Sequence, residues 1–275
     1  MNTGSYQVTK IASNVENEIE RLKGQVELFW NKELKRYIEF GLRDGISLVE
    51  LGSGPGFVIE KIKENFPDIQ VTAVEIDSVL VNYAKNYFNK KKIKNVKVIK
   101  KSIMETGLKN DTFDLAITRL VLEHLPDPLN AVREIHRILK PGGKAIFIDN
   151  DFEMHLMTYP HIPKLRKLYD AYCQCRYSEG GNPKIGRELP KLLKKSGFVN
   201  VDFEIINAHS EVDGDQKFFK SEGLGIPSKL VQEGVLSSKD LGEILIDWRN
   251  MLKDNNHSII RQLYMAVGEK TLQEP

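Results

Sequence analysis

The amino-acid sequence predicts an α/β fold in which helices cover both faces of a mostly parallel sheet. Between residues 45 and 150, five short runs rich in β-branched residues alternate with amphipathic stretches. The runs are almost continuously apolar, which is typical of strands buried on both faces. A strand followed by a helix, repeated several times, forms right-handed crossovers and therefore a parallel sheet.

The elements of this α/β core, assigned to residues 45–150, follow one another in a regular order. Strands are predicted at 47–51, 70–76, 96–100, 113–118 and 144–149. Helices are predicted at 57–66, 78–90 and 128–139.

The segments that flank this core carry other patterns. Apolar residues at helical spacing predict one or two helices over 13–43, as an N-terminal helical lid at 1–44. A helical and aromatic stretch at 151–178 is ended by Gly-Gly-Asn-Pro, so residues 151–183 are expected to form a helical cap.

The C-terminal part, residues 184–275, is expected to complete the core. Its predicted elements are a helix at 187–195, a strand at 201–208, a helical insertion at 211–257 and a closing strand at 261–270.

Composition narrows the class of ligand. A chain of 275 residues with 41% apolar and 28% charged residues suits one large α/β domain, with or without a cap. The net charge of +2 is close to neutral for this size, which disfavours a nucleic-acid partner. The basic run at 89–101 lacks aromatic residues placed for base stacking, so we interpret it as the solvated end of a helix and the flanks of a strand.

The two cysteines and the N-terminus indicate where the protein resides. Cys173 and Cys175 are one residue apart, which suits neither a mutual disulfide nor two ligands on one helix face, so we expect no metal. No secretion signal and no apolar run of about 18 residues is present, which predicts a soluble cytoplasmic protein without membrane contact.

A glycine-rich loop, "VELGSGPG" at 49–56, leaves the first predicted strand and enters the first predicted helix. The amides at that helix N-terminus point toward a ligand at the carboxyl end of the strand. Phe57 stands where a dinucleotide fingerprint has its third glycine, and Pro55 makes the loop rigid, so an adenosine-type ligand fits better than NAD. The alternative is that the glycines only permit close packing. The three glycines are Gly52, Gly54 and Gly56.

Glu75 ends the second predicted strand, at the same edge of the sheet as the glycine loop. A carboxylate at this position can accept hydrogen bonds from both hydroxyl groups of a ribose. The alternative is a solvated acid on the surface.

These features and the stretch "RLVLEHLPDPLNAVREIHRILKPGGKAIFID" (119–149) resemble the class I S-adenosylmethionine-dependent methyltransferases. The resemblance is to the small-molecule group with LGxGxG and LKPGG motifs. It covers residues 45–150 in motif detail and extends loosely to "RELPKLLKKSGF" (187–198) and the last predicted strand. It implies a Rossmann-like fold with seven strands, the last of them antiparallel.

The resemblance implies that S-adenosylmethionine is the cofactor, with the glycine loop near its methionine part, Glu75 on the ribose and Ile76 on the adenine. The family usually has an acidic residue at the position of Ser102, where a hydroxyl can make one hydrogen bond without charge assistance. The implied contacts are Gly52, Ser53, Gly54, Gly56, Glu75, Ile76, Ser102, Ile103 and, through its backbone, Arg119.

The N-terminal segment matches the same group in a shorter motif. Some members have a tyrosine near the start and an "RLxxQ" stretch, which correspond to Tyr6 and to "RLKGQ" ending at Gln25. The resemblance implies a lid over the cofactor. The alternative is that both are ordinary surface helix residues.

The chemistry of methyl transfer asks mainly that the acceptor be held in line behind the sulfonium carbon. A hydroxyl acceptor also needs a general base, for which His124 is the candidate, although a histidine there can simply cap the adjoining turn. Acceptor contacts are expected beyond the fifth predicted strand, where Asp149 can alternatively cap the next helix. The acceptor candidates are Asp149, Asp151, His155, Tyr159 and His161. The tyrosines at 159, 169, 172 and 177 either line the cap or pack between helices.

The sequence therefore predicts methyl transfer from S-adenosylmethionine to a nitrogen or oxygen atom of a small molecule. Two alternatives stay open at this point, which are a non-catalytic cofactor-binding sensor or scaffold and an NAD-dependent oxidoreductase. A homodimer is compatible with the sequence, and so is a monomer.

Overall fold

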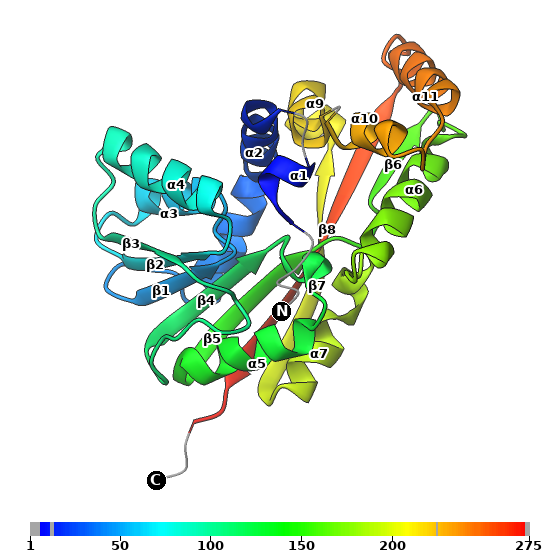
Figure 1. Ribbon diagram of the computed structural model, residues 1–275. Coiled ribbons are helices and arrows are strands. Elements are labelled where there is room, and N and C mark those ends of the chain that lie inside the picture. Colours follow the sequence, from blue (N-terminus) through cyan, green and yellow to red (C-terminus); the bar gives the residue numbers. More distant parts are fainter. Residues whose placement is uncertain (1–5, 12–13, 224, 273–275) are drawn as a thin grey trace.

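Within the part of the chain that the structure describes, eight strands form one twisted sheet (Figure 1). The computed structural model describes residues 6–11, 14–223 and 225–272, so the parts of the predicted lid, insertion and C-terminal segment at 1–5, 12–13, 224 and 273–275 lie outside the described residues. The strand order is β3-β2-β1-β4-β5-β8-β6, and β7 pairs with the other edge of β8.

The five predicted parallel strands are confirmed. They are β1 (Ser47–Leu51), β2 (Gln70–Glu75), β3 (Val96–Lys100), β4 (Phe113–Arg119) and β5 (Leu139–Asp149). The predicted antiparallel closing strand is β8 (Ser258–Lys270), which is flanked by β7 (Phe198–His209).

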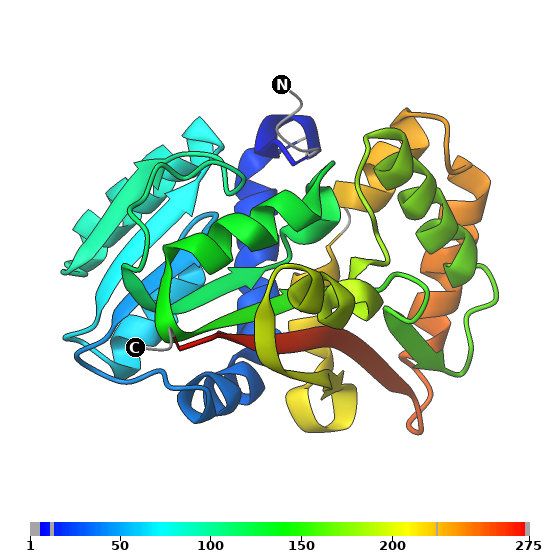
Figure 2. The same ribbon diagram turned by 90° about the horizontal axis from the view of Figure 1, so that it is seen from below.

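Helices cover both faces of this sheet, each over its own hydrophobic core (Figures 1 and 2). The elements on one face are α2 (Val15–Glu39), α3 (Phe57–Asn65) and α4 (Ser78–Lys91), and those on the other are α5 (Pro128–Ile138) and α7 (Leu189–Lys195). The α/β class with a mostly parallel sheet is thus confirmed. The predicted helix at 13–43 is a single helix, α2, whose N-cap Asn14 accepts a hydrogen bond from the Asn17 amide.

The segment 151–178 differs from its prediction as continuous helix. An eighth strand, β6 (Leu156–Tyr159), pairs with the start of β8, and α6 (Leu165–Ser178) begins only after it. Pro160 and Pro163 explain the difference, because the residue before a proline is pushed out of the helical region and toward extended backbone.

The remaining elements are helices, two of which, at 122–124 and 185–188, pack against the core. They are α1 (Val8–Ile11), the short 3-10 helices η1 (Leu122–His124) and η2 (Ile185–Glu188), and the helices α8 (Ser210–Asp213), α9 (Asp215–Glu222), α10 (Gly225–Gln232) and α11 (Ser238–Met251). A Cβ on Gly24 of α2 would lie 2.7 Å from the Lys220 carbonyl carbon of α9. This close approach joins the N-terminal helix to the predicted insertion at 211–257.

No helix within the described part of the chain is both long enough and apolar enough to cross a membrane.

Candidate functional site

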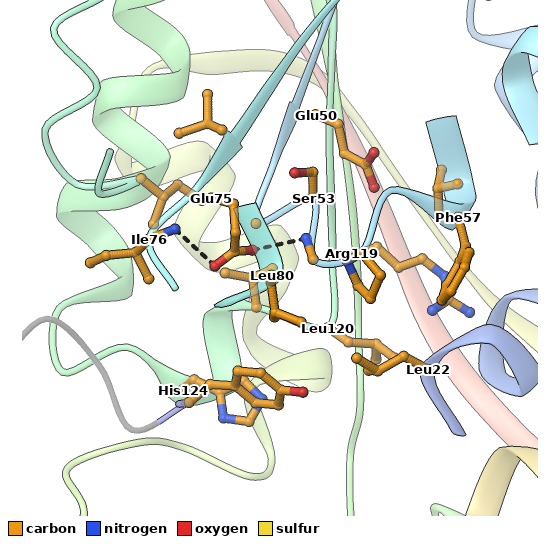
Figure 3. Close-up of a pocket in the computed structure, with 18 of the residues that line it drawn as sticks. Leu22, Glu50, Ser53, Phe57, Glu75, Ile76, Leu80, Arg119, Leu120 and His124 are labelled. Carbon is orange, nitrogen blue, oxygen red and sulfur yellow. Dashed lines mark hydrogen bonds between the residues drawn. The ribbon is translucent and has the colours of Figure 1, made fainter. Parts of the chain in front are cut away.

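Two adjoining cavities lie at the carboxyl ends of the parallel strands. The inner cavity, about 130 Å³, is enclosed by the ends of β1, β2 and β4, by α2 and by Tyr6 (Figure 3). The cap cavity, about 620 Å³, lies between α2, α6, α9, α10 and α11 and reaches the ends of β5 and β8. Five residues line both cavities, and we call them the shared wall. They are Tyr6, Leu22, Gln25, Leu120 and His124.

The structure brings the residues predicted to bind the cofactor together around the inner cavity, with one exception. Those that line it are Tyr6, Gln25, Gly52, Ser53, Gly54, Glu75, Ile76, Ser102, Ile103 and Arg119. The exception is Gly56, whose φ is +89° and where a Cβ would meet the Phe88 ring at 2.3 Å. Gly56 therefore permits close packing between α3 and α4.

The other two glycines shape the cavity itself. At Gly52 a Cβ would lie 2.3 Å from Val121 Cγ2, so the loop approaches the turn after β4 too closely for a side chain. Gly54 has φ +52° and nothing within 4 Å of a Cβ position. The space over Gly54 is therefore open to a ligand, and left-handed backbone favours glycine there.

Glu75 is buried and holds the glycine loop in place. Its carboxylate accepts hydrogen bonds from the amides of Gly54, Ile76 and Asp77, each at 2.8 Å. Burial raises the pKa of Glu75, and the three amides oppose that rise. Because a carboxylate offers about four acceptor positions, one remains for a ligand hydroxyl. The sequence predicts that Glu75 binds both hydroxyl groups of a ribose, but the second hydroxyl would need an acceptor other than Glu75.

Glu50 is a buried acid on the inner cavity that the sequence analysis missed. It lies near the end of β1 with 2% of its surface exposed, and its Oε2 has no hydrogen-bond partner among the described residues. Burial raises the pKa of Glu50 well above its usual range, although Arg119 opposes this. A buried acceptor without a partner is costly, so a cationic or N–H donor from a ligand would be stabilised there. Glu50 is the second residue of the loop motif at 49–56, and this position could have identified it as a site residue.

Arg119 has a structural role that the sequence did not indicate. Its Nε lies 3.0 Å from both carboxylate oxygens of Glu33, and its Nη2 donates to the Gln25 carbonyl at 2.8 Å. Glu33 is fully buried and also accepts from the Tyr37 hydroxyl at 2.9 Å. The Arg119–Glu33 ion pair thus fixes α2 to the end of β4 and holds Gln25 at the shared wall.

The N-terminal segment lies across the shared wall. The Tyr6 hydroxyl donates to Glu18 at 3.0 Å, and its ring contacts the His124 ring edge-on with centroids 5.1 Å apart. The Val8 amide donates to Asp77 at 2.9 Å, which ties α1 to the N-terminus of α4. Ser102 lines the opposite side, where its Oγ accepts from the Met104 amide at 3.2 Å.

His124 belongs to the shared wall and lines both cavities. It lies in η1 with 8% of its surface exposed, and its Nε2 is 3.6 Å from Glu123 Oε1. Burial lowers the pKa of His124 well below its usual range, and the nearby Arg176 and Arg21 lower it further. The imidazole is therefore neutral at pH 7.

The two acidic acceptor candidates lie outside both cavities. Asp149 accepts from the amides of Leu122 at 2.9 Å and Glu123 at 3.3 Å, so it caps η1 instead of facing a ligand. Burial raises the pKa of Asp149, with Glu123 adding to the rise. Asp151 is paired with Arg187.

Of the other candidates, only His155 lines the cap cavity. Tyr159 is 64% exposed, and His161 is also exposed, because β6 and the turn after it carry them to the outer surface. The tyrosines divide in the same way, since Tyr169 and Tyr172 line the cap cavity while Tyr177 is exposed.

The cysteines take no part in either cavity. Both are free, and burial raises the pKa of Cys173 to about 11. Within the described ranges, no group of three or more histidine, cysteine or acidic side chains is placed to hold a metal ion.

An ionic cluster in the cap cavity, formed by two buried side chains and one that is 25% exposed, was not predicted from the sequence. The Glu222 carboxylate lies 2.6 Å from Arg261 Nε and 3.2 Å from His155 Nε2. Although burial alone would raise it, Arg261 and His155 lower the pKa of Glu222 to about 2. The three residues come from α9, β8 and the turn before β6, and no local pattern connects them.

This cluster predicts how stability responds to acid. Since its pKa is lowered in the folded state from 4.5 to about 2, Glu222 stabilises the protein above about pH 4.5 and loses that contribution as pH falls toward 2. We expect Glu222→Gln to cost about 3 kcal/mol at pH 7 and progressively less below pH 4.5. Urea unfolding at a series of pH values measures this. The control is Glu64→Gln, on an exposed part of α3. A deficit that is constant with pH would contradict the assignment.

Comparison with known proteins identifies a family for part of the chain. Residues 49–147 match a family described as a methyltransferase domain. A demethylmenaquinone methyltransferase of Staphylococcus aureus is 24% identical over 215 residues, which cover 71% of this chain and 86% of the relative.

Solved structures share the fold. Phosphoethanolamine N-methyltransferase 2 of Haemonchus contortus, in complex with phosphomonomethylethanolamine and S-adenosylhomocysteine, superimposes with a TM-score of 0.60 at 20% identity over 88% of this chain. The chain spans about half of that protein, 53% of its length. A putative sarcosine dimethylglycine methyltransferase from Galdieria sulphuraria gives a TM-score of 0.57 at 17% identity, covering 98% of this chain and 93% of that one.

Proposed function

Because this chain is a class I S-adenosylmethionine-dependent methyltransferase, we propose that it transfers the methyl group to a nitrogen or oxygen atom of a small molecule held in the cap cavity. The observation that carries the proposal is the shared wall, since a donor in one cavity and an acceptor in the other would meet there. Holding two reactants in line across a short gap is the main contribution an enzyme makes to such a displacement.

The lining of the inner cavity suits several groups of the cofactor. The unpartnered Glu50 oxygen suits the ammonium of the methionine part, and the open space over Gly54 admits its chain. Glu75 has one acceptor position for a ribose hydroxyl. Ile76, Ser102 and Ile103 would surround the adenine. The bound cofactor supplies an electrophilic methyl group on a sulfonium centre.

The size of the inner cavity gives the N-terminal lid a role. At about 130 Å³ it lies below the 300–1,000 Å³ typical of ligand sites, so binding requires the enclosing segment to move outward. Tyr6, together with Leu22, Gln25 and Val26 of α2, lines it without belonging to the sheet or its crossovers. Closure behind the cofactor would exclude water from the sulfonium.

The relatives do not name one acceptor. Their names refer to demethylmenaquinone in one case and to phosphoethanolamine in another, and these differ chemically. Neither the scaffold alternative nor the NAD-dependent alternative is favoured by these comparisons.

The direct test is a transfer experiment. The protein is incubated with S-adenosylmethionine carrying a trideuterated methyl group and with a mixture of amines, phenols, alcohols and carboxylates, and the mixture is analysed by mass spectrometry. We expect S-adenosylhomocysteine to form together with one labelled product. Cofactor binding without any labelled compound would favour the scaffold alternative instead.

His124 gives a second prediction for an acceptor with an O–H group. A neutral imidazole at the shared wall can accept the proton, so we expect His124→Asn to lower kcat by about 10²–10³-fold. The affinity for S-adenosylhomocysteine should change less than about threefold if the role is in proton transfer alone. Turnover of the acceptor found above, and calorimetry, measure the two effects. An unchanged kcat would show that His124 is not the proton acceptor.

A further inference from the structure

We propose that the acceptor is an amphiphile with an uncharged polar head, which carries the methylated atom, and an apolar tail that occupies the far part of the cap cavity. The head would face the shared wall, and the tail would extend between α6, α10 and α11. This inference rests on the proposed function and specifies the class of molecule that the same site accepts.

The size and lining of the cap cavity support the apolar tail. Its volume of about 620 Å³ lies well inside the range of small-molecule sites and exceeds what a small amine or alcohol would fill. On α6, α10 and α11 most of the side chains that line it are apolar, and they include Leu168, Ile226, Ile244, Leu245 and Trp248. Moving a hydrocarbon chain from water into an apolar cavity lowers the free energy, so a tail would be stabilised there.

Along α6, the side chains that line the cavity change from apolar at the N-terminal end of the helix to polar toward its C-terminal end. At its C-terminal end, the Tyr172 hydroxyl lies 3.4 Å from Glu123, the residue next to His124. At its N-terminal end, Leu165 and Leu168 line the cavity, next to where Lys164 pairs with Asp240 of α11 at 2.8 Å. The polar end of the cavity is thus the end nearest the methyl donor.

The charges of the cap cavity argue for a head without net charge. Arg21 is paired with Glu18 at 2.7 Å, and Arg176 with Glu179 at 2.7 Å.

Arg261 is likewise paired with Glu222, at 2.6 Å, and Arg249 lies at the exposed surface of α11. Since each buried guanidinium already has a carboxylate, an anionic head would lose its hydration without gaining an uncompensated counter-ion. The buried carboxyl of Glu123, which a cationic head would face, already accepts from Asn150 Nδ2 at 3.0 Å and lies in the field of Arg176. Hydrogen-bonding side chains such as Asn150 remain to orient a hydroxyl, phenol or amide.

Displacement of a fluorescent probe tests this without turnover. N-phenyl-1-naphthylamine, which brightens in apolar surroundings, is bound to the protein with and without S-adenosylhomocysteine, and straight-chain alcohols from hexanol to dodecanol compete for it. We expect competition to strengthen about fourfold per added methylene until the cavity is filled. At equal chain length, we expect dodecanol to compete better than dodecanoate or dodecylammonium.

Two neighbouring residues of α11 provide a matched pair of variants. Leu245→Trp places extra bulk in the cap cavity, whereas Ile246→Trp adds the same bulk at a residue that is 58% exposed and does not line it. We expect only Leu245→Trp to shorten the chain length at which affinity stops rising.

Each negative outcome overturns a defined part of the account. Competition that is independent of chain length, or equal effects of the two variants, would overturn the apolar tail. Stronger competition by dodecanoate or dodecylammonium would overturn the uncharged head. Failure to bind S-adenosylhomocysteine would count against the proposed function, while the probe series still decides the amphiphile.

Discussion

Replacing Gly54 by valine is expected to weaken binding of S-adenosylhomocysteine at least about 100-fold. The new side chain would project into the open space of the inner cavity, because no atom lies within 4 Å of the Cβ position. Its φ of +52° also strains a β-branched residue, at a cost of about 1–3 kcal/mol. Calorimetric titration measures the affinity, and urea unfolding measures the strain.

A control at a second glycine separates the effect of backbone strain from the effect of filling the inner cavity. Gly45, in the exposed turn before β1, has φ +81° and likewise nothing within 4 Å of a Cβ, but it does not line the inner cavity. Gly45→Val should therefore lose similar stability and keep its affinity for S-adenosylhomocysteine. If Gly54→Val bound as tightly as Gly45→Val, the ligand would not occupy the space over the glycine loop.

Replacing Arg119 by methionine is expected to lower the free energy of unfolding by about 3–5 kcal/mol. The change leaves Glu33, which is fully buried, as a charge without its guanidinium partner. It also removes the hydrogen bond to the Gln25 carbonyl, so α2 loses its attachment to the end of β4. Urea unfolding measures the loss.

The control for this prediction is an arginine on α2, the helix that carries Glu33. Arg36 pairs with Glu39, Glu204 and Asp202 at the surface, where ion pairs contribute about 0–1 kcal/mol each. Arg36→Met should therefore cost much less than Arg119→Met. Equal losses would mean that burial of the Arg119–Glu33 pair is not what makes it important.

The α/β core could be predicted because its signals are local. The continuous apolar runs identified β1 to β5, and helical periodicity identified α2 to α5, since each pattern depends only on residues close in the chain. β6 could not be found in this way, because its four residues are held as a strand by pairing with β8, about a hundred residues later.

In the candidate site, too, the residues that local motifs indicate could be predicted, and the pairs that are distant in sequence could not. The contacts around Glu75 and the glycine loop come from motifs of the core, and ten of the predicted cofactor contacts line one cavity. Asp149 and Asp151 were chosen for their position in the chain, whereas the structure uses them for capping and for an ion pair. The partners of Glu222 and Arg119 are 39 or more residues away in sequence, so no local pattern could identify these pairs.

A crystal structure with S-adenosylhomocysteine tests the central claim most directly. The account predicts that the ligand lies in the inner cavity with its amino-acid part at Glu50. Its sulfur should face the shared wall, so that the missing methyl group would point past His124 into the cap cavity. A sulfur atom that faces the core of the sheet, or a ligand bound in the cap cavity instead, would contradict it.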